Sequence, residues 1–133
     1  MNNYTSIEQS KKLLELGLSP ESADMTYSKG NSLDGYHLTT MPFKICYGDF
    51  IAENGNMPCW SVGKLLQLMP RSIRIVNTFY GYELYVSVIG FAIDWWDVDR
   101  RRKLFSCDEE TLIDVCYKTV VWLLENGYIQ KED

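Results

Sequence analysis

The sequence has little histidine and no compact group of metal-binding residues. His37 is the single histidine, and the four cysteines (Cys46, Cys59, Cys107 and Cys116) include no C-x-x-C pair. Structural zinc sites need closely spaced cysteine and histidine ligands, so we expect no metal. The chain also lacks the motifs of a P-loop, a dinucleotide-binding turn, a zinc protease and a serine hydrolase. We therefore expect no cofactor and no catalytic site of these kinds.

Long apolar runs are missing as well. The longest uncharged apolar run, Val86–Ile93, contains a serine and a glycine and is far shorter than the ~20 residues that cross a bilayer. The segment Met1–Thr5 is polar and lacks the basic and apolar parts of a secretory signal. The cysteine spacing favours no disulfide, which is typical of a reducing compartment. These features predict a cytoplasmic protein without a membrane partner.

Positive charge is scarce, because 13 Lys and Arg residues face 18 Asp and Glu residues and give a formal net charge of −5. Nucleic acids are bound by a surplus of basic side chains, so the balance disfavours them. The exception is a basic run formed by Arg100, Arg101, Arg102 and Lys103. Basic residues beside aromatic ones can bind single-stranded nucleic acid. The nearby Asp97 and Asp99 favour the other interpretation, a solvated loop with paired charges.

The sequence contains enough apolar material for one globular domain. Its 133 residues are 46% hydrophobic and 14% aromatic, which excludes a disordered chain. A domain of this size buries about two-thirds of its unfolded surface and folds without a disulfide or a metal. We expect residues 1–133 to form a single domain.

Capping signals predict two helices at the start of the chain. Thr5 and Glu8 have the spacing of a capping box, and Gly17 supplies a stop. Pro20 follows a serine, as at the start of a second helix. We therefore expect a helical hairpin over residues 1–27.

The middle of the chain is predicted to be irregular and then helical. Glycine, asparagine and proline are concentrated in residues 28–57, which predicts an irregular connection. Ser61 is a capping residue followed by apolar side chains at helical spacing, and Pro70 ends the pattern. The predicted third helix spans residues 58–70.

Alternating apolar and polar residues over 73–105 predict an antiparallel sheet, with a first turn at Tyr80–Gly81 and a second turn or bulge at Gly90. A second capping box, Ser106 with Glu109, predicts a C-terminal helix over 107–126. The fold class is therefore α+β. We expect an antiparallel three- to four-stranded meander, with the N-terminal helices and the long C-terminal helix packed mainly on one face.

Three tryptophans form the candidate interaction surface. Trp122 interrupts the polar stripe of the last predicted helix, and Trp95 and Trp96 are adjacent in the predicted sheet. Indole rings are enriched at the centres of protein interfaces and are also frequent in cores, so both interpretations stay open. The leading hypothesis is a non-enzymatic interaction protein. Its partner would be another protein or a second copy of the chain in a homodimer.

Two other functions are open alternatives. A nucleic-acid-associated regulator would use Arg100–Lys103 or the N-terminal helix pair, although Glu21 and Asp24 in the second helix would repel phosphates. A small hydrolase would have to use His37, with Cys46 or Asp49 beside it.

Three segments carry a resemblance to a known family: IEQSKKLLELGL (7–18), PCWSVGKLLQLMP (58–70) and WLLENGYI (122–129). In this order they resemble a family of small uncharacterised proteins of Bacteroides-type gut bacteria, often encoded in prophage or mobile-element regions. The resemblance covers about a third of the chain. It implies a bacterial cytoplasmic setting and an accessory role for a phage or mobile element, and it implies no activity and no catalytic residue.

Overall fold

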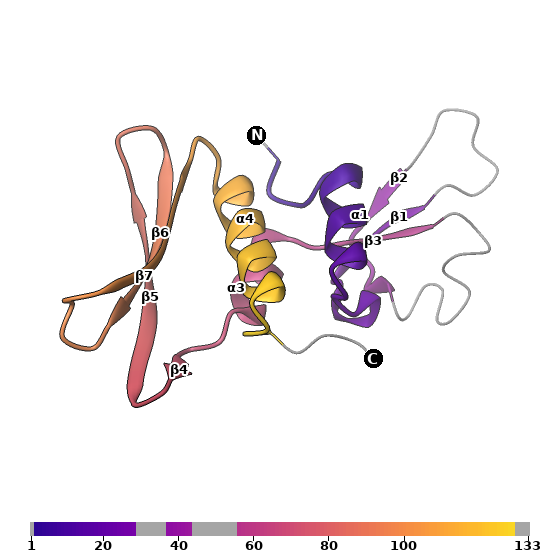
Figure 1. Ribbon diagram of the computed structural model, residues 1–133. Coiled ribbons are helices and arrows are strands. Elements are labelled where there is room, and N and C mark those ends of the chain that lie inside the picture. The colour runs from indigo at the N-terminus through magenta and orange to yellow at the C-terminus, as the bar shows by residue number, and fades with distance from the viewer. Residues whose placement is uncertain (1, 29–36, 44–55, 130–133) are drawn as a thin grey trace.

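The computed structural model describes residues 2–28, 37–43 and 56–129. It confirms the α+β class and contains two antiparallel sheets (Figure 1). The smaller sheet has the order β2-β1-β3 and is formed by β1 (Met25–Ser28), β2 (His37–Thr39) and β3 (Met57–Cys59). The larger sheet is a meander in chain order, formed by β4 (Ile73–Ile75), β5 (Thr78–Val86), β6 (Phe91–Asp97) and β7 (Lys103–Glu109).

The helices lie between the two sheets (Figure 1). They are α1 (Ile7–Glu15), α3 (Val62–Leu68) and α4 (Leu112–Glu125). The long helix α4 packs on β6 and β7 and on α3, while α1 packs on β3. The C-terminal helix therefore covers one face of the meander, as the sequence predicts. The largest fully buried side chains join these layers and include Trp60, Trp95, Phe43 and Leu13.

The first helix begins one residue later than its predicted cap. Ser6 is the N-cap: its hydroxyl accepts from the Gln9 N–H at 3.1 Å, and the Gln9 side chain accepts from the Ser6 N–H at 2.9 Å. Thr5 is instead fully buried, and its hydroxyl accepts from the Trp60 N–H at 3.1 Å. The predicted box of Thr5 with Glu8 was wrong, because Thr5 is needed to join the N-terminus to β3.

The predicted helical hairpin over residues 1–27 was also wrong in its second half. Only a single 3-10 turn, Pro20–Ser22, forms there, and the chain then becomes extended as β1. Asp24 holds this transition, because its carboxylate accepts hydrogen bonds from both the N–H and the hydroxyl of Ser61. A tertiary contact thus overrides the local helix signal.

Residues 28–57 hold more regular structure than predicted. Strand β2 lies within this range, and β3 begins at its end, pairing Met57 with Tyr27 of β1. The predicted helix over 58–70 is consequently shorter, because its first residues belong to β3. Ser61 is confirmed as the cap of α3, accepting from the Lys64 N–H at 3.1 Å.

The first turn of the meander is at Val76–Asn77 rather than at Tyr80–Gly81. Ile75 pairs with Thr78 across this turn, and Gly81 lies inside the long strand β5. Val76 adopts a φ of 58°, which a β-branched residue rarely does. The prediction placed the turn at the glycine, whereas the chain turns at a valine.

The last helix begins later than predicted. Ser106 and Glu109 lie in β7, which pairs with β6 and confirms the optional fourth strand. Thr111 is the N-cap of α4, and its hydroxyl accepts from the Asp114 N–H at 3.2 Å. The predicted cap at Ser106 was wrong because its hydroxyl donates to a carboxylate on β6, as described below.

Candidate interaction surface

Two of the three predicted surface tryptophans are part of the core. Trp95 is fully buried, and its ring centroid lies 5.0 Å from that of Tyr82 and 6.1 Å from that of Trp122. Trp122 stacks on Phe105 at 4.3 Å and contacts Tyr128 at 5.3 Å. This aromatic cluster joins α4 to the sheet. The structure therefore favours the core interpretation for both residues.

Trp96 lies on the opposite face of the sheet from Trp95, which we call the outer face. It is half-buried, and the Lys103 ammonium sits 4.8 Å from its ring centroid. A cation over an indole face is attracted by the ring electrons. Trp96 is thus the one predicted surface tryptophan that the structure leaves accessible from outside the helix layer.

The basic run lies at the end of the β6–β7 loop and the start of β7, and it has acidic neighbours. The Asp97 carboxylate accepts from the N–H groups of Arg101 and Arg102 at 2.7 and 3.0 Å. Arg100 forms an ion pair with Glu83 of β5. Lys103 lies 3.8 Å from the Asp94 carboxylate. Because carboxylates stand beside these groups, the run offers a weaker attraction for phosphates than its sequence suggests.

Asp94 is the most buried acid of the outer face, with 4% of its surface exposed. Its carboxylate accepts from the hydroxyls of Ser106 at 2.6 Å and Tyr85 at 2.8 Å. Burial alone would raise the pKa of this carboxyl. The two hydrogen bonds and the charge of Lys103 outweigh burial and hold the pKa of Asp94 below its usual value. The group is a satisfied structural carboxylate that fixes Tyr85.

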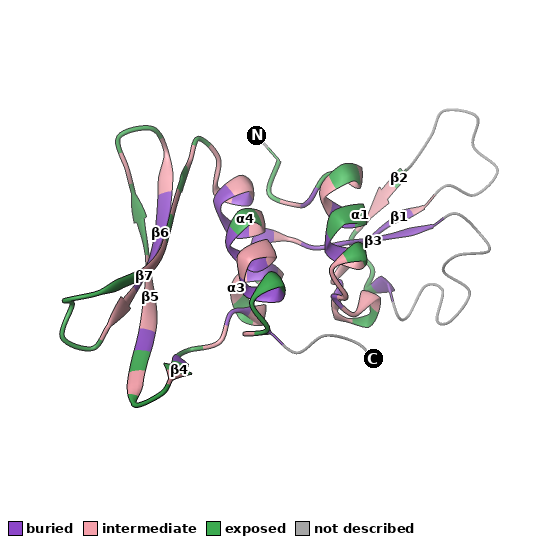
Figure 2. Cartoon of the chain, viewed as in Figure 1, coloured by how far each residue is buried: buried purple, intermediate pink, exposed green. Residues whose placement is uncertain are grey.

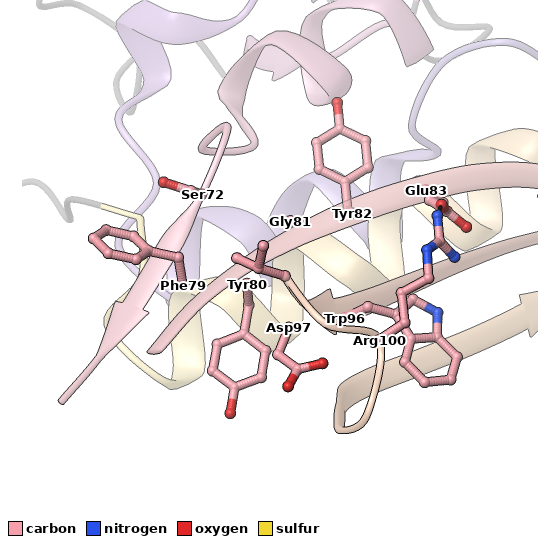
Figure 3. A pocket seen from close by; sticks show the side chains of 10 residues that line it. Ser72, Phe79, Tyr80, Gly81, Tyr82, Glu83, Trp96, Asp97 and Arg100 are labelled. Carbon is pink, nitrogen blue, oxygen red and sulfur yellow. Dashed lines mark ion pairs between the residues drawn. The ribbon is translucent and has the colours of Figure 1, made fainter. Parts of the chain in front are cut away.

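A hollow of about 350 Å³ lies beside Gly81, where a side chain is missing from the outer face. Figure 3 shows the Phe79 ring on one side of it, and the Trp96 indole near the paired Arg100 and Glu83 on the other. The hollow is open and has aromatic walls. Its lining also includes the carboxylates of Glu83, which is paired with Arg100, and of Asp97.

The β5–β6 hairpin ends in an apolar tip, which we define as Val86, Val88 and Ile89. Their exposed fractions are 79%, 103% and 55%. Figure 2 shows this end of the hairpin coloured as exposed. Hairpin tips are normally occupied by asparagine, aspartate or glycine, because their backbones suit the turn. Two β-branched apolar residues at such a position lie outside the hydrophobic core and contradict local turn preference.

The apolar tip is held rigidly at its base. A Cβ on Gly90 would come within 2.5 Å of the Glu109 and Glu110 carbonyl oxygens, so only glycine fits against this backbone. Ser87 donates a hydrogen bond to Asp108 and accepts one from the Gly90 N–H at 3.1 Å. The base of the hairpin is therefore fastened to β7 and to Glu110, just before α4.

Within residues 2–28, 37–43 and 56–129, no strand pairs with the edge of β5 beyond β4. Strand β4 pairs with β5 only from Thr78 to Tyr80. The Ser87 N–H donates to the Gly90 carbonyl at 3.0 Å, so the backbone groups of Ser87 point toward β6. Along an antiparallel strand, the N–H and C=O groups of successive residues point alternately to the two neighbouring strands. The N–H and C=O groups of Leu84 and Val86 consequently point away from β6. In the part of the chain that the structure describes, no backbone bond to them from that side is found.

The remaining candidates for chemistry are dispersed. His37 is exposed on β2 of the smaller sheet, and Cys46 lies outside the described residues. Cys59 is fully buried, and burial raises the pKa of its thiol to about 11. A thiol with such a pKa is a poor nucleophile at neutral pH. Among residues 2–28, 37–43 and 56–129, no cluster of three or more metal-ligating side chains occurs.

Sequence reasoning missed the apolar tip and the free edge. The alternating pattern assigns Val86 and Val88 to a strand and Gly90 to a turn or bulge, and it does not indicate that the two valines are exposed. A valine and an isoleucine directly before that glycine were a usable signal, since they occupy positions where turn formers are expected. The free edge had no such signal, because the length of β4 depends on where the chain leaves α3.

We compared the chain with models of protein families, with curated proteins and with solved structures, and none of them matches. Within the described residues, no helix has the length and apolar character needed to span a membrane.

Proposed function

We propose that this protein is a non-enzymatic interaction protein that binds another protein chain through the hairpin end of its larger sheet. The observation that supports this is the apolar tip: three exposed apolar side chains on a hairpin fastened at its base. Exposing them contributes nothing to folding, whereas apolar anchors held in one conformation bind at low entropic cost. The resemblance to accessory proteins of phages and mobile elements fits this proposal and stays a prediction.

The basic run supports a nucleic-acid partner less strongly than the apolar tip supports a protein partner. Glu83, Asp94 and Asp97 stand beside its charges, and the outer face around Trp96 is mixed in sign. A protein surface with aromatic, apolar and paired charged groups is typical of a protein interface. We therefore propose a protein, and not a nucleic acid, as the partner.

Photocrosslinking tests this proposal in cells that produce the protein, with a photoreactive amino acid in place of Val88. The same group at Met41, which is 52% exposed and whose carbonyl accepts a hydrogen bond from Thr26 of β1, is the matched control. We expect a covalent adduct of one defined mass from position 88 and none from position 41. Equal labelling at both positions would contradict the proposal. Binding of the protein to phospholipid vesicles that Val88→Ser abolishes would also overturn it, by assigning the tip to a membrane surface.

A further inference from the structure

Among the described residues, no further strand pairs with the free edge of β5, and beyond Glu83 the edge lacks the features that usually protect an edge strand. Natural edges carry lysine, proline or a bulge, or are covered by another element. Here the exposed segment is Leu84-Tyr85-Val86, with exposed fractions of 38%, 43% and 79%, and it contains no charge and no proline. The outward N–H and C=O groups of Leu84 and Val86 are ready to accept a further strand.

The start of this edge is blocked, which limits where an added strand can lie. Strand β4 occupies the edge up to Tyr80. Just beyond it, the Arg71 carbonyl oxygen comes within 3.8 Å of where a Cβ on Gly81 would be. An added strand can therefore pair only from about Glu83 onward.

We propose that the added strand is β5 of a second copy of this chain, antiparallel across a two-fold axis at Tyr85. Leu84 then faces Val86 of the other copy, and each of these residues exchanges its outward N–H and C=O groups with its counterpart. Their side chains lie on the same face of the joined sheet, so apolar surface meets apolar surface. This inference rests on the proposed interaction function and names the partner.

Charge and sterics select this register. With the axis at Tyr85, Glu83 faces Ser87 of the other copy, and Tyr85 faces its own counterpart. An axis at Glu83 would place two carboxylates opposite each other, which is unfavourable. An axis at Leu84 would bring the tip of the second copy against the position of β4 beside Tyr80. The edge is thus complementary to itself in this antiparallel arrangement, as an isologous contact requires.

The dimer joins two four-stranded sheets into one continuous sheet. Few residues pair, so the interface is small, and such interfaces are typically weak and concentration-dependent. The apolar tips lie next to the joined edges. Val86, the most exposed member of the pairing segment, becomes covered by Leu84 of the other copy.

Sedimentation of the full chain across a concentration series tests the dimer. For the wild type we expect the mass to rise from 15.4 kDa towards twice that value. Two double variants, Leu84→Lys with Val86→Lys and Leu84→Glu with Val86→Glu, each place like charges opposite one another. Each should stay monomeric alone, and an equimolar mixture should form a heterodimer. Met41→Lys adds the same kind of charge just after β2 and should dimerise like the wild type.

A wild type that stays at 15.4 kDa at every concentration would overturn the dimer. So would a dimer that both double variants preserve. Recovery of the dimer in the mixture shows that each variant is folded, so loss of folding cannot mimic the expected result. A failure of the dimer can be distinguished from a failure of the proposed function. A monomeric protein that forms a defined adduct with another protein at Val88 would keep the interaction function and would exclude only the second copy as partner.

Discussion

The two faces of the larger sheet have the same alternating sequence pattern but different surroundings. On the helix side, Trp95 is enclosed by Tyr82 and by Trp122 of α4. On the outer face, the next residue, Trp96, has Lys103 over its ring and lines an open hollow. Alternation thus shows which side chains share a face, whereas only the position of a long helix shows which face is covered. The comparison separates stability from binding, and each prediction below tests one side of it.

The largest expected effect is on the helix side. Replacing Trp95 by alanine removes a fully buried indole and should lower the free energy of unfolding by about 3–5 kcal/mol. Trp96→Ala removes the same group from the outer face and should cost about 1 kcal/mol. Urea denaturation of both variants measures the difference. Equal losses would show that the outer face is as firmly covered as the helix side.

The second effect concerns the base of the hairpin. Gly90→Ala forces a Cβ to within 2.5 Å of two carbonyl oxygens and should destabilise the fold by about 1–3 kcal/mol. Gly63→Ala is the control, because its new Cβ would meet only the Ser61 hydroxyl at 3.9 Å. As Gly63 lies within α3, alanine there should stabilise by about 0.5–1 kcal/mol. Thermal unfolding followed by circular dichroism compares them, and a tolerated alanine at position 90 would mean a loosely held tip.

The third effect is a pH dependence on the outer face. The pKa of Asp94 is lowered in the fold, so its stabilising contribution is complete above the usual carboxyl pKa. That contribution is lost as the pH falls through the lowered value. Asp94→Asn loses the charged hydrogen bonds and should cost about 1–2 kcal/mol at neutral pH. It should also reduce the acid sensitivity of urea unfolding.

Asp99→Asn removes the same charge from the β6–β7 loop and serves as its control. It should leave the acid dependence as in the wild type. If Asp94→Asn changes the dependence no more than Asp99→Asn does, the network of Asp94 with Ser106 and Tyr85 contributes nothing to stability.

The fold class could be predicted from the sequence, because α+β order follows from where the periodicity changes from helical to alternating. Element boundaries failed where a distant contact decided them. Asp24 binds Ser61 and replaces a predicted second helix with a strand. Ser106 binds Asp94, so β7 continues through a predicted helix cap. In both cases, a tertiary hydrogen bond made by a polar side chain outweighs the local helix signal.

The candidate surface was harder to predict than the fold. Indole content correctly marked large apolar groups, but two of the three lie under α4, and no sequence pattern shows which face that helix covers. The tip was visible in the sequence as Val88 and Ile89 in place of turn formers. The free edge required the structure, because it depends on β4 ending after three residues, Ile73–Ile75.

The smallest expected effect on stability is at the apolar tip. Replacing Val88 and Ile89 together by serine removes two exposed side chains that have no role in the core, so the free energy of unfolding should change by less than about 0.5 kcal/mol. Binding of a hydrophobic dye should fall, because the largest exposed apolar group of the hairpin is gone. Urea denaturation and dye fluorescence measure the two properties on one sample. A stability loss comparable to that of Trp95→Ala would assign the tip to the core. It would contradict the distinction between side chains that stabilise the fold and side chains that are exposed for binding.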